Sequence, residues 1–140
     1  MYALLVLDMQ VGLVHGPDRP WRGPELLETV NALLHKARSA GAGIFLARHI
    51  GPVGSPIEPG SPLTLLAPEL TLLGSEVVFE KHRPNAFAMT GLAEQLRACG
   101  AMPSMVAAAS ALCGFIRPGA SLQPARPCSL KNGKSSVLWR

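Results

Sequence analysis

The sequence lacks any apolar run long enough to cross a membrane. Its longest runs of this kind, Ala3–Leu7 and Met105–Ala109, fall far short of the roughly 20 residues that a spanning helix needs. The first residues also lack the basic segment and long apolar stretch of a secretory signal. We therefore expect a cytoplasmic protein with no membrane partner.

Cysteine is scarce as well, with 3 residues in a chain of 140. An odd number forms no complete disulfide framework, which favours a reducing compartment. Charged residues make up only 16% and hydrophobic residues 48%, which is the balance of a globular protein. The length suits one domain with a single core and is too short for two.

Acidic residues are absent from the last third of the chain. Residues 1–94 hold all 9 acidic residues and 7 basic ones, whereas residues 95–140 hold 6 basic residues and no acidic one. A basic tail of this kind is one signature of a nucleic-acid-binding arm. Here the charges are scattered, and only Phe115 and Trp139 are available to stack on bases, so we expect no nucleic-acid partner.

Short apolar runs bounded by turn residues predict the strands. A continuous apolar run indicates a strand buried on both faces, which is typical of a parallel sheet covered by helices. The order of strand, loop, helix and strand at the start of the chain is a βαβ unit. The predicted strands are Ala3–Leu7, Gly43–Ala47, Glu76–Phe79 and Ser104–Ala109.

Proline, glycine and helical periodicity place the other elements. Pro24 suits the first position of a helix, and apolar residues then recur at helical spacing until Gly41. A second, shorter helix is predicted with Thr90 as its N-cap and Gly100 at its end. The segments His15–Pro24 and Gly51–Pro68 are rich in proline and glycine, so they are predicted to be loops.

Regular patterns end near Arg117. Prolines and glycines interrupt every later candidate element, and Ser136–Trp139 is the one short strand candidate. We therefore assign 1–117 to the domain and 118–140 to an irregular basic tail. The loss of acidic residues and of periodicity near residue 101 indicates a shifted reading frame or a truncated product after the fourth strand. Sequencing the gene with its downstream DNA tests this hypothesis, and finding no matching continuation in another frame would refute it.

Three chemically capable residues each follow a predicted strand. Asp8, Lys81 and Cys113 lie at or just beyond the carboxyl ends of the first, third and fourth strands, where ligands bind in open parallel sheets. A nearby ammonium and a helix beginning at Cys113 would favour the reactive thiolate. Asp8 would act as general base and then general acid. Backbone N–H groups of Leu112 and Cys113 would stabilise an oxyanion.

Each of these residues also has a structural interpretation. Asp8 suits a loop anchor, Lys81 a solvated charge beside Glu80, and Cys113 a small buried hydrophobic residue. Cys99 fits a packing role better than Cys113, because it lies on the apolar face of the second predicted helix.

Several sequence blocks, taken in order, resemble the isochorismatase-like cysteine hydrolase superfamily. ALLVLDMQVGL (3–13) is similar to the first strand of that family, and FEKHRPNAFAMTGL (79–92) to its K-x-R-x-S-A-F-x-x-T-x-L block. The segments 48–49, 60–62 and 68–70 resemble its middle loop. The resemblance implies a three-layer αβα fold with a mainly parallel, Rossmann-like sheet.

The cysteine block of that family, G-x-x-T-x-x-C-V, corresponds here to AAASALCG (107–114), where a serine replaces the threonine and Ala107 replaces the glycine. The resemblance implies catalysis by Asp8, Lys81 and Cys113. It implies cleavage of a C–N bond in a small amide through a thioester, or of an enol ether with Asp8 as the proton donor. It also implies a small-molecule substrate, no cofactor and a homo-oligomer.

Other residues near these blocks are candidates for substrate binding. Arg48 and Arg83 suit an anionic group, His49 suits the pocket lining, and Phe87, with Trp21 nearby, suits an apolar wall. Exposed arginines and a packed Phe87 are the structural alternatives. No second histidine or paired carboxylate stands at ligand spacing from His49, so we predict no metal site.

Two other classes compete with the hydrolase. An inactive, truncated domain would bind a partner or itself through its unfinished sheet. A flavodoxin-like nucleotide-binding protein would need a Gly-rich phosphate loop, and the sequence has none.

Overall fold

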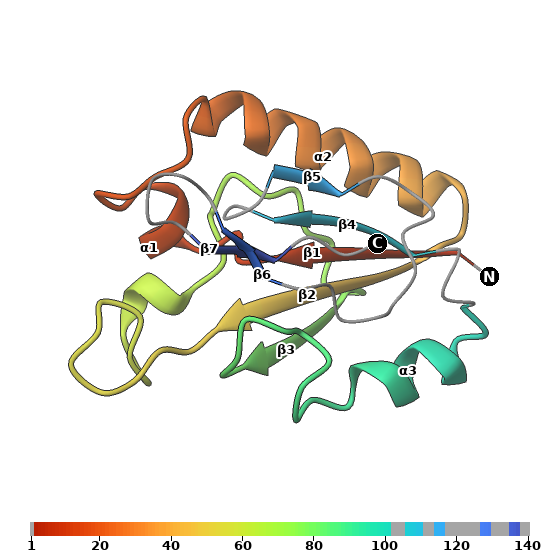
Figure 1. The fold of residues 1–140 in the computed structure, drawn as a ribbon. Helices are drawn as coiled ribbons and strands as arrows, with labels where there is room; N and C mark the ends of the chain where they lie inside the picture. Colours follow the sequence, from red (N-terminus) through yellow and green to blue (C-terminus); the bar gives the residue numbers. More distant parts are fainter. Residues whose placement is uncertain (1, 102–105, 111–113, 117–126, 130–134, 138–140) are drawn as a thin grey trace.

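Five strands form the central sheet, in the order β3-β2-β1-β4-β5 (Figure 1). The computed structural model describes residues 2–101, 106–110, 114–116, 127–129 and 135–137. Within the sheet β1 to β4 are parallel, and β5 is antiparallel to β4. The strands are β1 (Ala3–Leu7), β2 (Gly43–His49), β3 (Val77–Lys81), β4 (Val106–Ser110) and β5 (Gly114–Ile116).

The register of the parallel strands brings their carboxyl ends to one edge. Leu7 at the end of β1 lies opposite Ala47 of β2 and Ser110 of β4. His49 at the end of β2 lies opposite Lys81 at the end of β3. The four strands predicted from apolar runs are thus confirmed, with β2 and β3 each extending two residues further.

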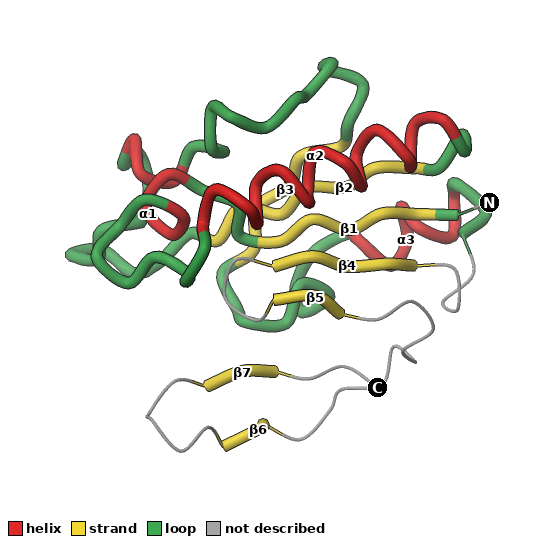
Figure 2. The backbone as a smooth tube through the Cα atoms, turned by 90° about the horizontal axis from the view of Figure 1, so that it is seen from above, coloured by secondary structure: helices red, strands yellow, loops and turns green. Residues whose placement is uncertain are grey.

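Helices cover both faces of the sheet, so the predicted three-layer fold is confirmed (Figures 1 and 2). On one face, α2 (Gly23–Ser39) packs against Leu4 and Val6 of β1. On the other, α3 (Leu92–Ala98) packs against Ala3, Leu5 and Leu7 of β1, while all five residues of this strand are buried. Each of these leucine and valine side chains contributes about 1.5–3 kcal/mol when fully buried.

Both predicted helices are found at the predicted positions, as α2 and α3, with one correction to a helix cap. Pro24 stands in the first turn of α2, and Gly41 follows that helix with a φ of 64°. Thr90 is not the N-cap of α3, because that position belongs to Gly91. The Thr90 hydroxyl donates to the Ala86 carbonyl at 2.5 Å and accepts from the Leu92 N–H, at the start of α3, at 3.5 Å, so the side chain links the preceding turn to the helix.

Two short helical elements lie between the strands and helices that the sequence pattern predicts. The first loop opens with a short helix, α1 (Val11–Val14), and the long loop after β2 contains a 3-10 helix, η1 (Pro62–Thr64). The helix considered from Cys113 is absent, because Gly114–Ile116 extend the sheet as β5. Aromatic and β-branched side chains at 115 and 116, followed by a proline at 118, favour a strand here.

Two further strands, β6 (Pro127–Ser129) and β7 (Ser135–Val137), pair with each other in a separate antiparallel sheet (Figure 2). β7 overlaps the predicted strand at 136–139. The predicted domain boundary after residue 117 lies outside the described residues. None of the helices in the described ranges has the length and hydrophobicity of a membrane span.

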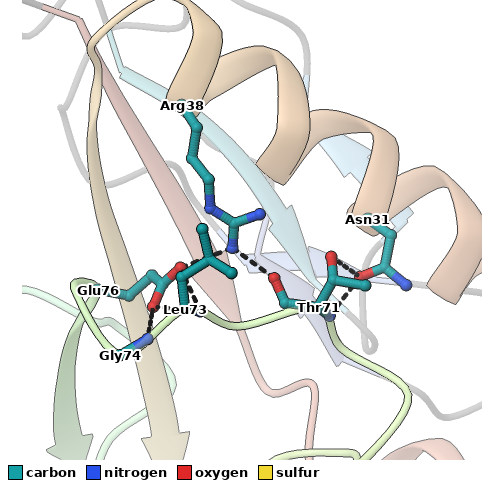
Figure 3. Close-up of polar contacts among 6 residues, drawn as sticks. All are labelled: Asn31, Arg38, Thr71, Leu73, Gly74 and Glu76. Atoms are coloured by element: carbon teal, nitrogen blue, oxygen red, sulfur yellow. Dashed lines mark hydrogen bonds and ion pairs between the residues drawn. The ribbon is translucent and has the colours of Figure 1, made fainter.

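A polar cluster ties α2 to the segment that enters β3 (Figure 3). The Asn31 side-chain oxygen accepts from the N–H and the hydroxyl of Thr71, at 2.9 and 3.1 Å. Arg38 donates to the Thr71 carbonyl and, at 2.6 Å, to the Glu76 carboxylate, whose side chain is 2% exposed. The same carboxylate accepts from the backbone N–H groups of Leu73 and Gly74.

These contacts set the charge state of Glu76. Burial raises its pKa, but the hydrogen bonds from Arg38 and from the backbone outweigh burial, and the pKa lies below its ordinary value of 4.5. Glu76 is therefore ionised at neutral pH and holds the start of β3 against α2.

Candidate active site

Three polar side chains meet at the edge of the sheet where β1, β2 and β3 end. Asp8 directly follows β1, His49 is the last residue of β2, and Lys81 is the last residue of β3. This edge was predicted from the parallel order of the strands. Its three residues come from separate segments, and the sheet brings Asp8 and Lys81 together although more than 70 positions of sequence separate them.

The backbone of Asp8 turns its carboxylate toward Lys81. Alternation along β1 places Leu4 and Val6 on the α2 side of the sheet, and Asp8 would be next in that series. Asp8 instead has a φ of 62°, and it is Met9 that packs in the α2 cluster. Aspartate tolerates this left-handed conformation better than most residues do. The Asp8 N–H still donates to the Ala47 carbonyl, at 3.1 Å.

Lys81 and Asp8 form a buried ion pair. The Lys81 Nζ lies 2.9 Å from the Asp8 Oδ1, and the two side chains are 1% and 5% exposed. Lys81 Nζ also lies 3.0 Å from the His49 Nδ1 and 3.4 Å from the Arg83 carbonyl oxygen. Desolvation offsets most of the attraction within a buried pair, so net stability alone does not account for placing two charges here.

His49 is half-buried beside these charges, and its pKa lies below the ordinary value of 6.5. Burial is the main cause, because it disfavours the imidazolium, and the Lys81 ammonium lowers the pKa further. The Asp8 carboxylate acts in the opposite direction, and His82 adds a smaller lowering effect. His49 is consequently neutral at pH 7.

Gln10 fixes the backbone of this site and was missed by the sequence analysis. Its side chain is fully buried, and its Nε2 donates to the carbonyl oxygens of His49 and Thr64, at 2.9 and 3.0 Å. Its Oε1 accepts from the His49 N–H, at 2.6 Å. The available signal was an uncharged polar residue between two apolar ones, Met9 and Val11, immediately after a buried strand.

The predicted substrate-binding residues occupy different positions. His49 is in the cluster. Arg48, on the other side of β2, donates to the Glu80 carboxylate at 2.6 Å, across the β2–β3 register. Arg83 is exposed and contributes its carbonyl oxygen to Lys81, whereas Phe87 is partly buried against the α3-side core. The four substrate-binding roles stay predictions.

Trp21 lies apart from this cluster. It is 93% exposed and lines a cavity of about 670 Å³ between the loop after α1 and the first turns of α2. No residue that lines this cavity belongs to the Asp8, His49 and Lys81 cluster. Trp21 therefore does not join Phe87 in one wall within the described structure.

Leu112 and Cys113 lie outside the described residues, so their predicted roles stay predictions. Cys99 is partly buried against the α3-side core, as its packing interpretation requires, and its Sγ lies 3.2 Å from the Leu96 carbonyl oxygen. The part of the chain that the structure describes holds no group of three or more His, Cys, Asp or Glu side chains able to share a metal ion.

Comparison with proteins of known sequence and structure places this chain in a family. The chain is 31% identical over 117 residues to streptothricin hydrolase of Streptomyces noursei, covering 78% of this chain and 42% of that protein. The chain thus spans less than half the length of this relative.

Solved structures share the fold. An isochorismatase from Pseudomonas putida is 33% identical, with a TM-score of 0.68 over 78% of this chain and 56% of its own. N-carbamoylsarcosine amidase from Thermoplasma acidophilum has the same TM-score at 21% identity, over 77% of this chain and 66% of its own, which shows a shared fold alone. The model of the isochorismatase domain matches residues 2–109. By this match and these relatives, the chain belongs to the isochorismatase family.

Proposed function

We propose that this chain is a hydrolase that cleaves a C–N bond of a small amide, with Cys113 as nucleophile and Asp8 and Lys81 as its catalytic partners. The observation that carries the proposal is the buried contact of 2.9 Å between Lys81 Nζ and Asp8 Oδ1 at the carboxyl edge of the sheet. Buried charged groups at this edge of a parallel sheet are typical of active sites.

The route of the chain supports a role for Cys113. Ser110 ends β4 directly opposite Leu7, one residue before Asp8. Cys113 follows Ser110 by three residues, which span at most about 11 Å when fully extended, and we propose that this short separation brings its thiol to the Asp8 carboxylate. The strand at Gly114–Ile116 removes the helix dipole as a source of thiolate stabilisation, which leaves that task to the Lys81 ammonium.

The proposed reaction has two steps, formation of a thioester and its hydrolysis. Asp8 accepts the thiol proton as Cys113 Sγ attacks the amide carbon, and Asp8 then returns the proton to the departing nitrogen. Water next attacks the thioester carbon while Asp8 takes a proton from it, and Asp8 then gives that proton to Cys113 Sγ as the C–S bond breaks, which releases the acid and restores the thiol. The N–H groups of Leu112 and Cys113 are proposed to stabilise both oxyanions. Lys81 keeps the Asp8 carboxylate oriented throughout.

The substrate is proposed to be a small amide. The relative named streptothricin hydrolase makes streptothricin the first compound to assay, followed by simple primary amides. Arg48 and Arg83 are proposed to meet an anionic group, and Phe87 to line the pocket. No cofactor takes part in the proposed reaction.

Two substitutions test the mechanism. Cys113→Ala and Asp8→Asn are both expected to abolish amide hydrolysis, whereas Cys99→Ala leaves the rate unchanged. Full turnover by Cys113→Ala together with loss in Asp8→Asn would overturn the thioester mechanism and favour acid cleavage of an enol ether by Asp8.

Alkylation separates the active enzyme from an inactive domain. Iodoacetamide near neutral pH is expected to modify Cys113 faster than Cys99 or Cys128, and Lys81→Met is expected to slow that reaction. Equal, slow modification of all three cysteines would instead support the inactive, partner-binding domain.

We also propose that the protein is a cytoplasmic homo-oligomer whose hydrolase domain ends at residue 117. The edge strand β3 exposes Val77 and Val78, and an apolar edge of this kind favours pairing with a second copy. Sedimentation velocity tests this proposal: a single monomeric species at micromolar concentration would overturn it.

A further inference from the structure

We infer that His49 is a positioning residue, which as the neutral Nε2–H tautomer accepts a hydrogen bond from Lys81 and holds the ammonium on Asp8. The inference rests on the proposed function for its catalytic consequence. The tautomer and the contact stand on the geometry alone. This role differs from the pocket lining that the sequence indicates, because it acts through Lys81 and not on the substrate.

The contacts of Lys81 determine which ring nitrogen of His49 carries the proton. An ammonium carries three N–H donors and no acceptor. Three acceptors surround Lys81 Nζ: the Asp8 Oδ1 at 2.9 Å, the His49 Nδ1 at 3.0 Å and the Arg83 carbonyl oxygen at 3.4 Å. The His49 Nδ1 must therefore accept, which assigns the ring proton to Nε2.

The backbone of His49 is fixed independently of its ring. Gln10 accepts from the His49 N–H at 2.6 Å and donates to its carbonyl at 2.9 Å. The Ile50 N–H donates to the Lys81 carbonyl at 2.9 Å, so the end of β2 is also tied to the residue whose side chain His49 contacts. The imidazole is thus held at a fixed distance from Nζ by the strands themselves.

The charges that face the ring come from two elements. Asp8 follows β1, Lys81 ends β3, and His82 comes next in the chain. Protonation of His49 would place an imidazolium 3.0 Å from an ammonium, and Nδ1 would lose its acceptor character. The neutral ring is consequently the form that can accept a hydrogen bond from the Lys81 ammonium.

Two amide substitutions at position 49 isolate the acceptor. The oxygen of His49→Asn reaches the place of Nδ1, whereas the amide of His49→Gln reaches the place of Nε2. His49→Gln is expected to lower kcat on the order of 10- to 100-fold, the effect of a small misplacement of a catalytic group, with KM unchanged. His49→Asn is expected to stay within about threefold of wild type by the same reasoning. His35→Asn, on the exposed face of α2, is the control.

A spectroscopic measurement on the unmodified full chain keeps the inference independent of activity. Long-range 1H–15N correlation spectra at pH 7 are expected to show His49 protonated at Nε2, with the His49→Asn spectrum assigning its signals. An Nδ1–H tautomer or an imidazolium would overturn the inference, as would equal kcat losses in the two variants or a raised KM. The expected tautomer in a chain that hydrolyses nothing would instead refute the proposed function and leave the inference intact.

Discussion

The side chain of Gln10 holds His49 at both of its backbone polar groups. Its Oε1 accepts from the His49 N–H at 2.6 Å, and its Nε2 donates to the His49 carbonyl at 2.9 Å. The same Nε2 donates to the Thr64 carbonyl at 3.0 Å. One buried amide therefore joins the ends of β1 and β2 to the loop that carries η1, and it fixes the backbone of His49.

Gln10→Met is expected to lower the free energy of unfolding by about 1–3 kcal/mol, because a side chain of similar size leaves buried backbone groups without partners. Urea unfolding followed by circular dichroism measures the change. Gln95→Met on the exposed face of α3 is the matched control and is expected to stay within about 0.5 kcal/mol of wild type. Equal effects of the two substitutions would contradict the role of the Gln10 contacts.

Lys81→Met is expected to cost about 3–5 kcal/mol of unfolding free energy, because it leaves the Asp8 carboxylate buried without its counter-charge. Adding Asp8→Asn to this variant should restore much of the loss, since the double variant buries no charge. Glu80→Gln breaks the more exposed pair with Arg48, and its cost should be at most about 1 kcal/mol. Thermal or urea unfolding of these variants measures whether breaking the buried pair costs more unfolding free energy than breaking the exposed one.

The fold follows from local features of the sequence. The apolar run Ala3–Leu7 needs cover on both faces, and such a strand occurs in a parallel sheet between two helical layers. Pro24 and Gly41 bound α2 because each suits the backbone of a helix end. The cap of α3 is one residue later than the sequence predicts, since Gly91 takes the N-cap position and Thr90 bonds both the turn before the helix and the Leu92 N–H.

The site was only partly predictable, for reasons of geometry. Parallel strands bring their ends together whatever their side chains, so the meeting of Asp8 and Lys81 followed from strand order. The φ of 62° at Asp8 decides which face its carboxylate takes, and no residue pattern signals it. The pairing of Arg48 with Glu80 depends on the β2–β3 register, which local sequence does not encode.

Glu76→Gln is expected to weaken the anchor between α2 and β3 by about 1–3 kcal/mol at pH 7, because the neutral amide accepts the Arg38 and backbone hydrogen bonds less well. The pKa of Glu76 lies below 4.5 in the folded chain. Its contribution is therefore fully present above pH 4.5 and lost as the pH falls through the lower folded value. Glu94→Gln, in the exposed pair with Arg97, is the control and should change little. Urea unfolding between pH 3 and pH 7 tests both statements.

The depressed pKa of His49 predicts a separate loss of stability at milder acidity. Below about pH 6.5 the unfolded chain binds a proton at His49 that the folded chain, whose ring is half-buried beside Lys81, does not yet bind. The unfolding free energy should therefore decline as the pH falls from 6.5 toward the folded pKa, a range above that of Glu76. His49→Asn should lack this part of the decline, whereas His35→Asn should retain it. If the unfolding free energies of wild type and His49→Asn changed with pH in the same way, that result would contradict a lowered pKa for His49 in the folded chain.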